Sequence, residues 1–237
     1  MTRRIFGILF ALSLLAGCSI SQSPLTCDIG QGGGSGGWFA KYTLKPGQPT
    51  GACSQLIGEG LGVRKYFPNT GGPLVVIRTD ILATMAQSMP PPIDQTVADS
   101  EGSLIQDHPD ANNLCTIPSM SAAEVSVAGY DVKYEWSDVQ FVVEPNVPGT
   151  QMSATMKDTE AGCTAEYKVV AMQPNVDCFQ IDSQGNPVLD SMGNQIPDVS
   201  RCSPQNNVNP DFAVTCDPDS YKCVLASDPP SLLNRGQ

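Results

Sequence analysis

Nine cysteines dominate the residues of this chain that could do chemistry. The spacing contains no Cys-x-x-Cys pair, and the chain has a single histidine, His108, so neither a zinc site nor a redox-active dithiol is indicated. An odd number of cysteines in an exported chain leaves one cysteine without a disulfide partner. If Cys18 has another role, the remaining eight are enough for structural disulfides. These eight are Cys27, Cys53, Cys115, Cys163, Cys178, Cys202, Cys216 and Cys223.

The sequence leaves the connectivity of these cysteines open, because eight of them allow about a hundred sets of pairs. Two local pairs are favoured, since each brackets a plausible turn beside a short strand. A third pair is a weaker expectation, and the fourth follows by elimination. The expected pairs are Cys216–Cys223, Cys163–Cys178, Cys27–Cys53 and Cys115–Cys202.

The sequence lacks the common motifs of other kinds of catalytic site. The chain lacks Gly-x-Ser-x-Gly and His-Glu-x-x-His, and the glycine run at 32–37 does not lead from a strand into a helix as a phosphate cradle does. His108 stands in a polar loop, Asp107-His108-Pro109-Asp110, where an exposed side chain is expected. We therefore expect no enzyme, no cofactor and no metal. A hydrolase built on two carboxylates stays open as an alternative, because two acids can come from any strands of a β protein.

The segment before Cys18 has the parts of a secretory signal. Arg3 and Arg4 are followed by an apolar stretch, 5–15, that is too short to cross a bilayer. Leu15-Ala16-Gly17-Cys18 resembles the lipobox of bacterial lipoproteins. That resemblance implies cleavage before Cys18, a diacylglyceryl group on its sulfur, and a membrane anchor made of lipid. The alternative is an ordinary secretory signal with a chance cysteine.

Two features bear on where such a chain resides. By the sorting rule of well-studied lipoproteins, an Asp after the lipidated cysteine retains the protein in the inner membrane, so Ser19 implies the outer membrane. Cleavage would remove 17 of the 237 residues, two of them arginines, which takes the net charge from −11 to −13. Such an acidic surface argues against nucleic acid and favours a soluble, self-repelling surface. Attraction to cations or basic partners is the sharper alternative.

The elements that must position these residues are mostly strands. Residues 38–44 alternate apolar and polar side chains, and 74–77 is a short apolar run typical of a buried strand. From 125 to 178 the apolar residues recur with period two, interrupted by turn signals at 137–138, 145–149 and 158–162, which predicts an antiparallel meander. We expect a second sheet, from 38–80 and the C-terminal segment, to cover the apolar face of the meander.

The rest of the chain is predicted to be irregular. Residues 18–37 carry the lipidated cysteine and a Gly-rich tether, shorter if Cys27 is bridged to the body, and 38–237 form the β-rich domain. One or two helical turns fit 81–89 before three prolines, and 90–118 is expected to be a long loop. Asp182-Ser183-Gln184-Gly185-Asn186 recurs eight residues later as Asp190-Ser191-Met192-Gly193-Asn194. Each Gly-Asn fits a tight turn, with cation binding by the two aspartates as the alternative.

Four short segments carry a second resemblance. They are Tyr134-Glu135-Trp136-Ser137, Pro148-Gly149-Thr150-Gln151, the segment 211–218 (DFAVTCDP) and Cys223-Val224-Leu225. Together they are similar to an uncharacterised group of myxobacterial outer-membrane lipoproteins. This resemblance implies a location at the outer membrane and no particular chemistry.

We therefore expect an all-β chain, a disulfide-stapled antiparallel β sandwich with long loops. Its expected role is that of an outer-membrane lipoprotein that acts as a structural or protein-interaction module, attached through lipid on Cys18 and contacting a protein of the cell envelope. The alternative is a sandwich that binds a carbohydrate or small ligand on exposed rings of Trp38, Tyr42 or Trp136.

Overall fold

The structure is a computed structural model that describes residues 24–33, 37–90 and 94–233. The expected signal peptide, Cys18 and Ser19 lie outside the described residues. The described part is rich in strands and holds one short α-helix, α1 (Asp80–Gln87). The strands are β1 (Trp38–Leu44), β2 (Gly58–Tyr66), β3 (Leu74–Thr79), β4 (Asp99–Ser103), β5 (Leu114–Ser119), β6 (Ala123–Val127), β7 (Tyr130–Glu144), β8 (Val147–Glu160), β9 (Cys163–Met172), β10 (Val214–Asp217) and β11 (Lys222–Leu225).

Nine of these strands form one antiparallel sheet in the order β4-β3-β2-β1-β9-β8-β7-β5, with β6 also paired to β7. The long strands β7, β8 and β9 follow one another as hairpins, which confirms the expected meander. Strand β1 then pairs with β9 and brings β2, β3 and β4 into the same sheet. The expectation that residues 38–80 build a separate covering sheet is therefore wrong.

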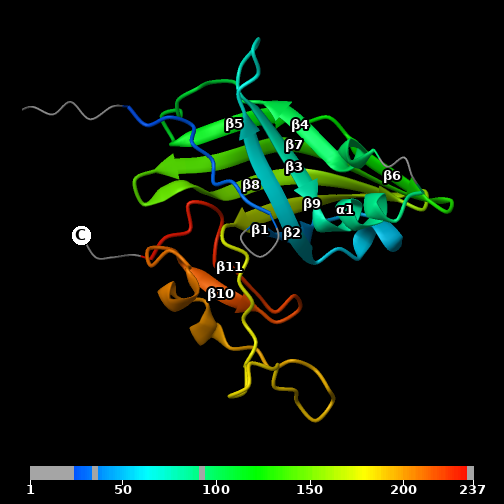
Figure 1. Cartoon of the computed structure of the whole chain (residues 1–237), viewed down its shortest axis with the longest axis vertical. Coiled ribbons are helices and arrows are strands. Elements are labelled where there is room, and N and C mark those ends of the chain that lie inside the picture. Colours follow the sequence, from blue (N-terminus) through cyan, green and yellow to red (C-terminus); the bar gives the residue numbers. More distant parts are fainter. Residues whose placement is uncertain (1–23, 34–36, 91–93, 234–237) are drawn as a thin grey trace, which may run out of the picture.

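The sheet covers its own apolar face because it curls until its two edges nearly meet (Figure 1). The backbone N–H of Ile105, just after β4, donates to the carbonyl of Thr116 on β5 at 3.1 Å. The N–H of Ser121 donates to the carbonyl of Glu101 on β4 at 2.8 Å. Twist accumulates from strand to strand, so a sheet of this width bends far enough to enclose a core.

The enclosed core is aromatic and continuous. Trp38 on β1 meets Phe141 on β7 edge-on, with ring centroids 5.7 Å apart. Tyr134, Trp136 and Tyr167 are also fully buried on the inner face. These residues stand at alternate positions of their strands, so the period-two pattern correctly predicts which face of the meander is buried.

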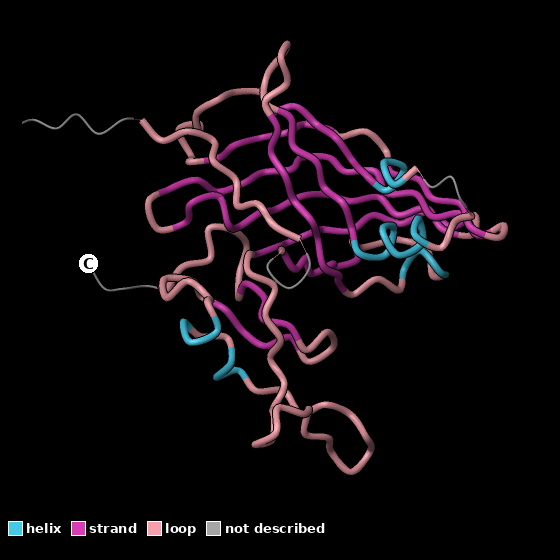
Figure 2. Tube along the Cα trace, viewed as in Figure 1, coloured by secondary structure: helices cyan, strands magenta, loops and turns pink. Residues whose placement is uncertain are grey.

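The C-terminal part packs on the outside of the sheet rather than over its apolar inner face. Val142, Val147 and Met172 point outward from β7, β8 and β9 into a second core with Phe212 and Leu225. The side chain of Gln151 on β8 accepts from the N–H of Ser231 at 2.7 Å and donates to its carbonyl at 3.1 Å. Strands β10 and β11 form their own two-stranded sheet below the main one (Figures 1 and 2).

Two local expectations are wrong. The turn signal at Ser137-Asp138 does not end a strand, because β7 continues through it with a shift of register between Ser137 and Gln140. Asp138 has φ 51°, a left-handed conformation that accommodates the extra residue as a bulge. The segment 90–118 is not one long loop, since it contains β4 and β5, whose sequences lack a clear apolar alternation.

The N-terminal segment is fastened to the body. Cys27 is fully buried and bonded to Cys115 at the start of β5. The N–H of Gly30 donates to the carbonyl of Gly149 at 2.8 Å, and Gly32 exchanges backbone hydrogen bonds with Val63. The part of the expected tether that the structure describes therefore lies on the sheet, as anticipated for a bridged Cys27.

Candidate functional site

A projecting arm, residues 179–201, is the most distinctive feature outside the sheet. It leaves β9, runs away from the sheet to the far end of the molecule and returns to the β10–β11 hairpin (Figure 1). Figure 2 shows it as irregular chain apart from a short helical turn, Val199–Arg201. The path of its backbone nevertheless follows a repeat in the sequence.

The arm and the cysteine that follows it form a threefold repeat of eight residues, 179–186, 187–194 and 195–202, with an aspartate at the fourth place of each. The second residues of the three repeats form a ring of backbone hydrogen bonds. Val188 N–H donates to Gln180 at 2.9 Å, Ile196 N–H to Val188 at 3.3 Å, and Gln180 N–H to Ile196 at 2.8 Å. Sequence reasoning found two of the repeats. The third was missed because Asp198 keeps the spacing but the Gly-Asn that should follow is replaced.

The aspartates of the first two repeats hold their own turns. Asp182 Oδ1 accepts from the N–H groups of Gln184 and Asn186 at 2.8 and 2.9 Å. Asp190 Oδ1 accepts from those of Met192 and Asn194 at the same distances. These donors, that of Asn186 or Asn194 foremost, lower the pKa of each carboxyl. The tight turns are confirmed, with φ of 88° at Gly185 and 86° at Gly193. The turn aspartates thus have a structural use that does not involve a cation.

The base of the arm is fastened by two disulfides. Cys178, just before it, bonds to Cys216 on β10, and Cys202, just after it, bonds to Cys223 on β11. Cys216 and Cys223 face each other directly in the hairpin. Cys178, Cys202 and Cys223 also have sulfurs close enough together to share a metal ion, but all three are committed to these disulfides.

All eight cysteines assigned to disulfides are paired, but in a connectivity that differs from every expected pair. The other two bonds are Cys27–Cys115 and Cys53–Cys163. The local pairs Cys216–Cys223 and Cys163–Cys178 are wrong because each bracketing cysteine reaches a segment distant in the chain. The pairs Cys27–Cys53 and Cys115–Cys202 are wrong with them. Topology, rather than proximity in sequence, decides the partners.

The arm holds apolar side chains in solvent. Ile181, Leu189, Met192 and Val199 are 45%, 54%, 81% and 60% exposed. Single exposed apolar residues are ordinary on a protein surface, and four of them on one projecting segment make the arm a candidate contact surface. The arm contains three aspartates and one basic residue, Arg201 at its end, so this surface is acidic as well as apolar.

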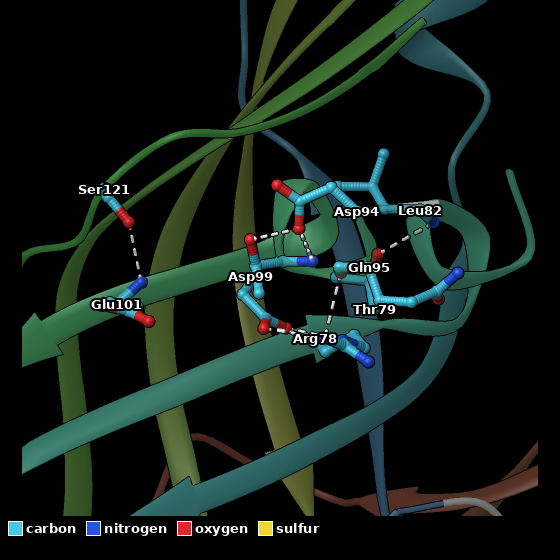
Figure 3. A network of polar contacts seen from close by, with 9 residues as sticks. Arg78, Thr79, Leu82, Asp94, Gln95, Asp99, Glu101 and Ser121 are labelled. Carbon is cyan, nitrogen blue, oxygen red and sulfur yellow. Dashed lines mark hydrogen bonds and ion pairs between the residues drawn. The ribbon is translucent and has the colours of Figure 1, made fainter. Parts of the chain in front are cut away.

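A groove on the outer side of β2, β3 and β4 is the second candidate. It has a volume of about 260 Å³ and its lining includes Arg64, Tyr66, Arg78, Asp80 and Asp99. Arg78 is committed to Asp99 through two hydrogen bonds, at 2.5 and 2.7 Å, and its Nη2 also donates to the carbonyl of Gln95 at 3.0 Å (Figure 3). This pairing raises the pKa of Arg78. The two arginines and two aspartates of the groove balance in charge, which does not favour an anionic ligand.

Two carboxyls lie inside the curled sheet. Glu59 accepts from the hydroxyl of Tyr42 at 2.9 Å and from the N–H of Ile81 at 2.8 Å, and burial raises its pKa to about 7. Asp158 is fully buried, neither of its oxygens has a hydrogen-bond partner among the described residues, and burial raises its pKa to about 7. Sequence reasoning missed both. The signal for Asp158 was its place after Ala154 and Met156 on the inward side of β8.

The other predicted site residues have structural surroundings. Trp38, Tyr42 and Trp136 are 0%, 4% and 2% exposed, so the expected stacking platform of exposed rings is wrong. Their alternation with polar residues reflects packing in the core. His108 lies in an exposed loop, as predicted, where its Nδ1 is 2.8 Å from the carbonyl oxygen of Leu25.

Comparison with known proteins decides the family. A family model described as MlpA matches residues 36–174, more than half of the chain. A Myxococcus xanthus protein described as "Putative lipoprotein MlpA" is 30% identical over 254 aligned residues, which cover 98% of this chain and 99% of that protein.

The chain belongs to the MlpA family.

The resemblance to myxobacterial lipoproteins is thereby confirmed. The matched MlpA region comprises the curled sheet through β9 and includes Tyr134–Ser137 and Pro148–Gln151. The arm and the β10–β11 hairpin lie beyond it, within the range shared with the Myxococcus relative. No solved structure matches the chain. None of the helices in the described part of this MlpA-family protein is long and apolar enough to cross a membrane.

Proposed function

We propose that this MlpA-family protein is an outer-membrane lipoprotein, anchored by lipid on Cys18, that acts without catalysis as a protein-interaction module of the cell envelope. The arm is the contact surface. The single observation that carries the proposal is an element with two disulfides at its base and a ring of backbone hydrogen bonds within it, which holds Ile181, Leu189, Met192 and Val199 in solvent.

Rigidity supports this role on energetic grounds. Binding immobilises side chains and loops, and that loss of freedom costs affinity. A segment already fixed by disulfides and turn aspartates loses little further freedom when it binds. The charge supports a particular kind of partner, because acidic side chains beside apolar ones favour an apolar surface with a basic rim.

Catalysis finds no comparable support. Glu59 is 7% exposed and Asp158 is fully buried, so the two carboxyls with raised pKa values are enclosed in the core, away from solvent. A carboxyl pair that hydrolyses a glycoside needs room between its members for the substrate and for water.

The test is co-purification from detergent-solubilised membranes of the natural host. We expect the wild-type protein to retain a stoichiometric envelope protein and the variant Leu189→Ser/Met192→Ser to lose it. The matched control is Ile57→Ser/Tyr130→Ser, which removes two exposed apolar side chains from the body. Loss of the partner in the control alone, or in neither variant, would contradict a role for the arm.

A further inference from the structure

The face from which the N-terminal segment leaves the molecule carries its own apolar patch. We define the tether face by Leu25, Phe67 and Ile105, which are 38%, 75% and 62% exposed. Phe67 belongs to the hairpin loop between β2 and β3, and Ile105 follows β4. A hollow of about 330 Å³ lies among Thr26, Asp28, Lys65, Phe67, Pro68, Gly71, Gly72, Pro73 and Asp107.

Contacts join these loops into one surface. Lys65 Nζ donates to the carbonyl of Cys27 at 2.6 Å and lies 4.8 Å from the centre of the Phe67 ring. The N–H of Cys27 donates to the carbonyl of Asp107 at 2.8 Å, and that of Leu104 to the carbonyl of Pro73 at 3.0 Å. The hairpin with Phe67 is therefore bound directly to the segment that leads to Cys18.

The length of chain outside the structure limits how far this face can stand from the anchor. Cys18 lies nine positions before Cys27, which is held by its disulfide to Cys115. An extended chain covers about 3.5 Å per residue, so Cys27 lies within about 30 Å of the lipidated cysteine. Lipid on Cys18 thus holds the tether face near the bilayer whatever path the chain takes.

We propose that the tether face rests on the lipid bilayer, with the Phe67 ring among the headgroups and the arm directed away from the membrane. Phenylalanine and aliphatic side chains favour the boundary between headgroups and acyl chains. Lys65 balances one of the two aspartates around the hollow, so apolar contact rather than charge drives the docking. The β2–β3 hairpin and the tip of the arm stand at opposite ends of the longest axis (Figure 1).

This inference rests on the lipid anchor of the proposed function, and its test separates the two. The lipidated full-length protein is reconstituted into vesicles of phosphatidylethanolamine and phosphatidylglycerol with brominated acyl chains, which quench nearby tryptophans. Phe67→Trp reports the tether face, and Met192→Trp, in the Asp190–Asn194 turn of the arm, is the matched control. The native Trp38 and Trp136 are buried, so the wild-type signal can be subtracted.

We expect the emission added by Phe67→Trp to be shifted to the blue and quenched by brominated lipid, and that added by Met192→Trp to be unaffected. Ile105→Trp repeats the measurement at a second point of the face. If the variants float with the vesicles but position 67 is quenched no more than position 192, the docking proposal is overturned while the anchor stands. If none of them floats, and the wild type behaves like Cys18→Ala, the anchor and the docking both fail.

Discussion

At the scale of single residues, the buried carboxyls are the groups whose chemistry departs most from the ordinary. Asp158 faces Tyr134 across β7 and β8, and Ala165 across β8 and β9, and the described residues offer no hydrogen-bond donor to either of its oxygens. An isolated carboxylate in such a setting is costly, so the group keeps its proton instead. Glu59 accepts hydrogen bonds from Tyr42 and Ile81, and these together with Thr79 lower its pKa, but burial has the larger effect and raises it.

This has a definite consequence for stability. The pKa of Asp158 rises from about 4 in the unfolded chain to about 7 in the folded one. Between those values the unfolded chain releases the proton and the folded protein keeps it. The contribution of Asp158 to the free energy of unfolding is therefore greatest below pH 4 and is lost as the pH rises to 7, by an amount on the order of 4 kcal/mol.

We therefore expect Asp158→Asn to be more stable than the wild type at pH 8, by about 1–3 kcal/mol, and to match it more closely at pH 5. Denaturant unfolding of both proteins at the two pH values measures the difference. Asp131→Asn, at an exposed position of β7, is the matched control. Its free energy of unfolding should differ between pH 5 and pH 8 by as much as that of the wild type. An equal effect of Asp158→Asn at both pH values would show that the carboxyl ionises normally in the fold.

At the scale of elements, the arm depends on its two disulfides more than on packing. Most of its residues are exposed, and its ends meet on facing cysteines of the β10–β11 hairpin. Lys41 on β1 pairs with the buried Asp217 of β10, which helps to hold that hairpin against the main sheet. The arm and its base are thus built as a separate attachment to the sheet.

Removing one of these bonds should free the arm without unfolding the sheet. The Cys202–Cys223 bond joins residues 21 apart, and a link of that length stabilises by about 3 kcal/mol in the chain-entropy model. We expect Cys202→Ser/Cys223→Ser to be cut by thermolysin within 179–201 at least about tenfold faster than the wild type. Cys27→Ser/Cys115→Ser is the control. If it exposes the arm equally, the arm is not held locally.

The elements also show how far the sequence leads. The bounds of β1 and the buried face of β7, β8 and β9 followed from period two, because local alternation reflects burial on one side of a sheet. The bounds of β4 (Asp99–Ser103) and β5 (Leu114–Ser119) could not be predicted in this way. Both strands lie at the edges of the sheet, and their sequences lack a clear apolar alternation. Disulfide partners and the closing of the sheet depend on curvature, which no local pattern encodes. The repeat at Asp182 and Asp190 could be found in the sequence. The ring of backbone hydrogen bonds that the third repeat completes could not.

At the scale of the whole molecule, the protein has two ends with different proposed contacts, one with the bilayer and one with a partner protein. The tether face carries Phe67 and the segment leading to Cys18, and the arm, in which Met192 is exposed, extends to the opposite end of the longest axis (Figure 1). The curled sheet between them encloses a continuous hydrophobic core. A lipoprotein of this shape would present its contact surface at a fixed distance from the bilayer.

The most direct test of this account is photo-crosslinking in intact cells of the natural host, with a photoreactive residue at position 192 or, as control, at Tyr130 on the body. Both positions are exposed, so both probes are accessible. The account predicts one discrete adduct with an envelope protein from position 192 and none from position 130. No adduct at 192, or the same adducts from both positions, would contradict the claim that the arm is the contact surface.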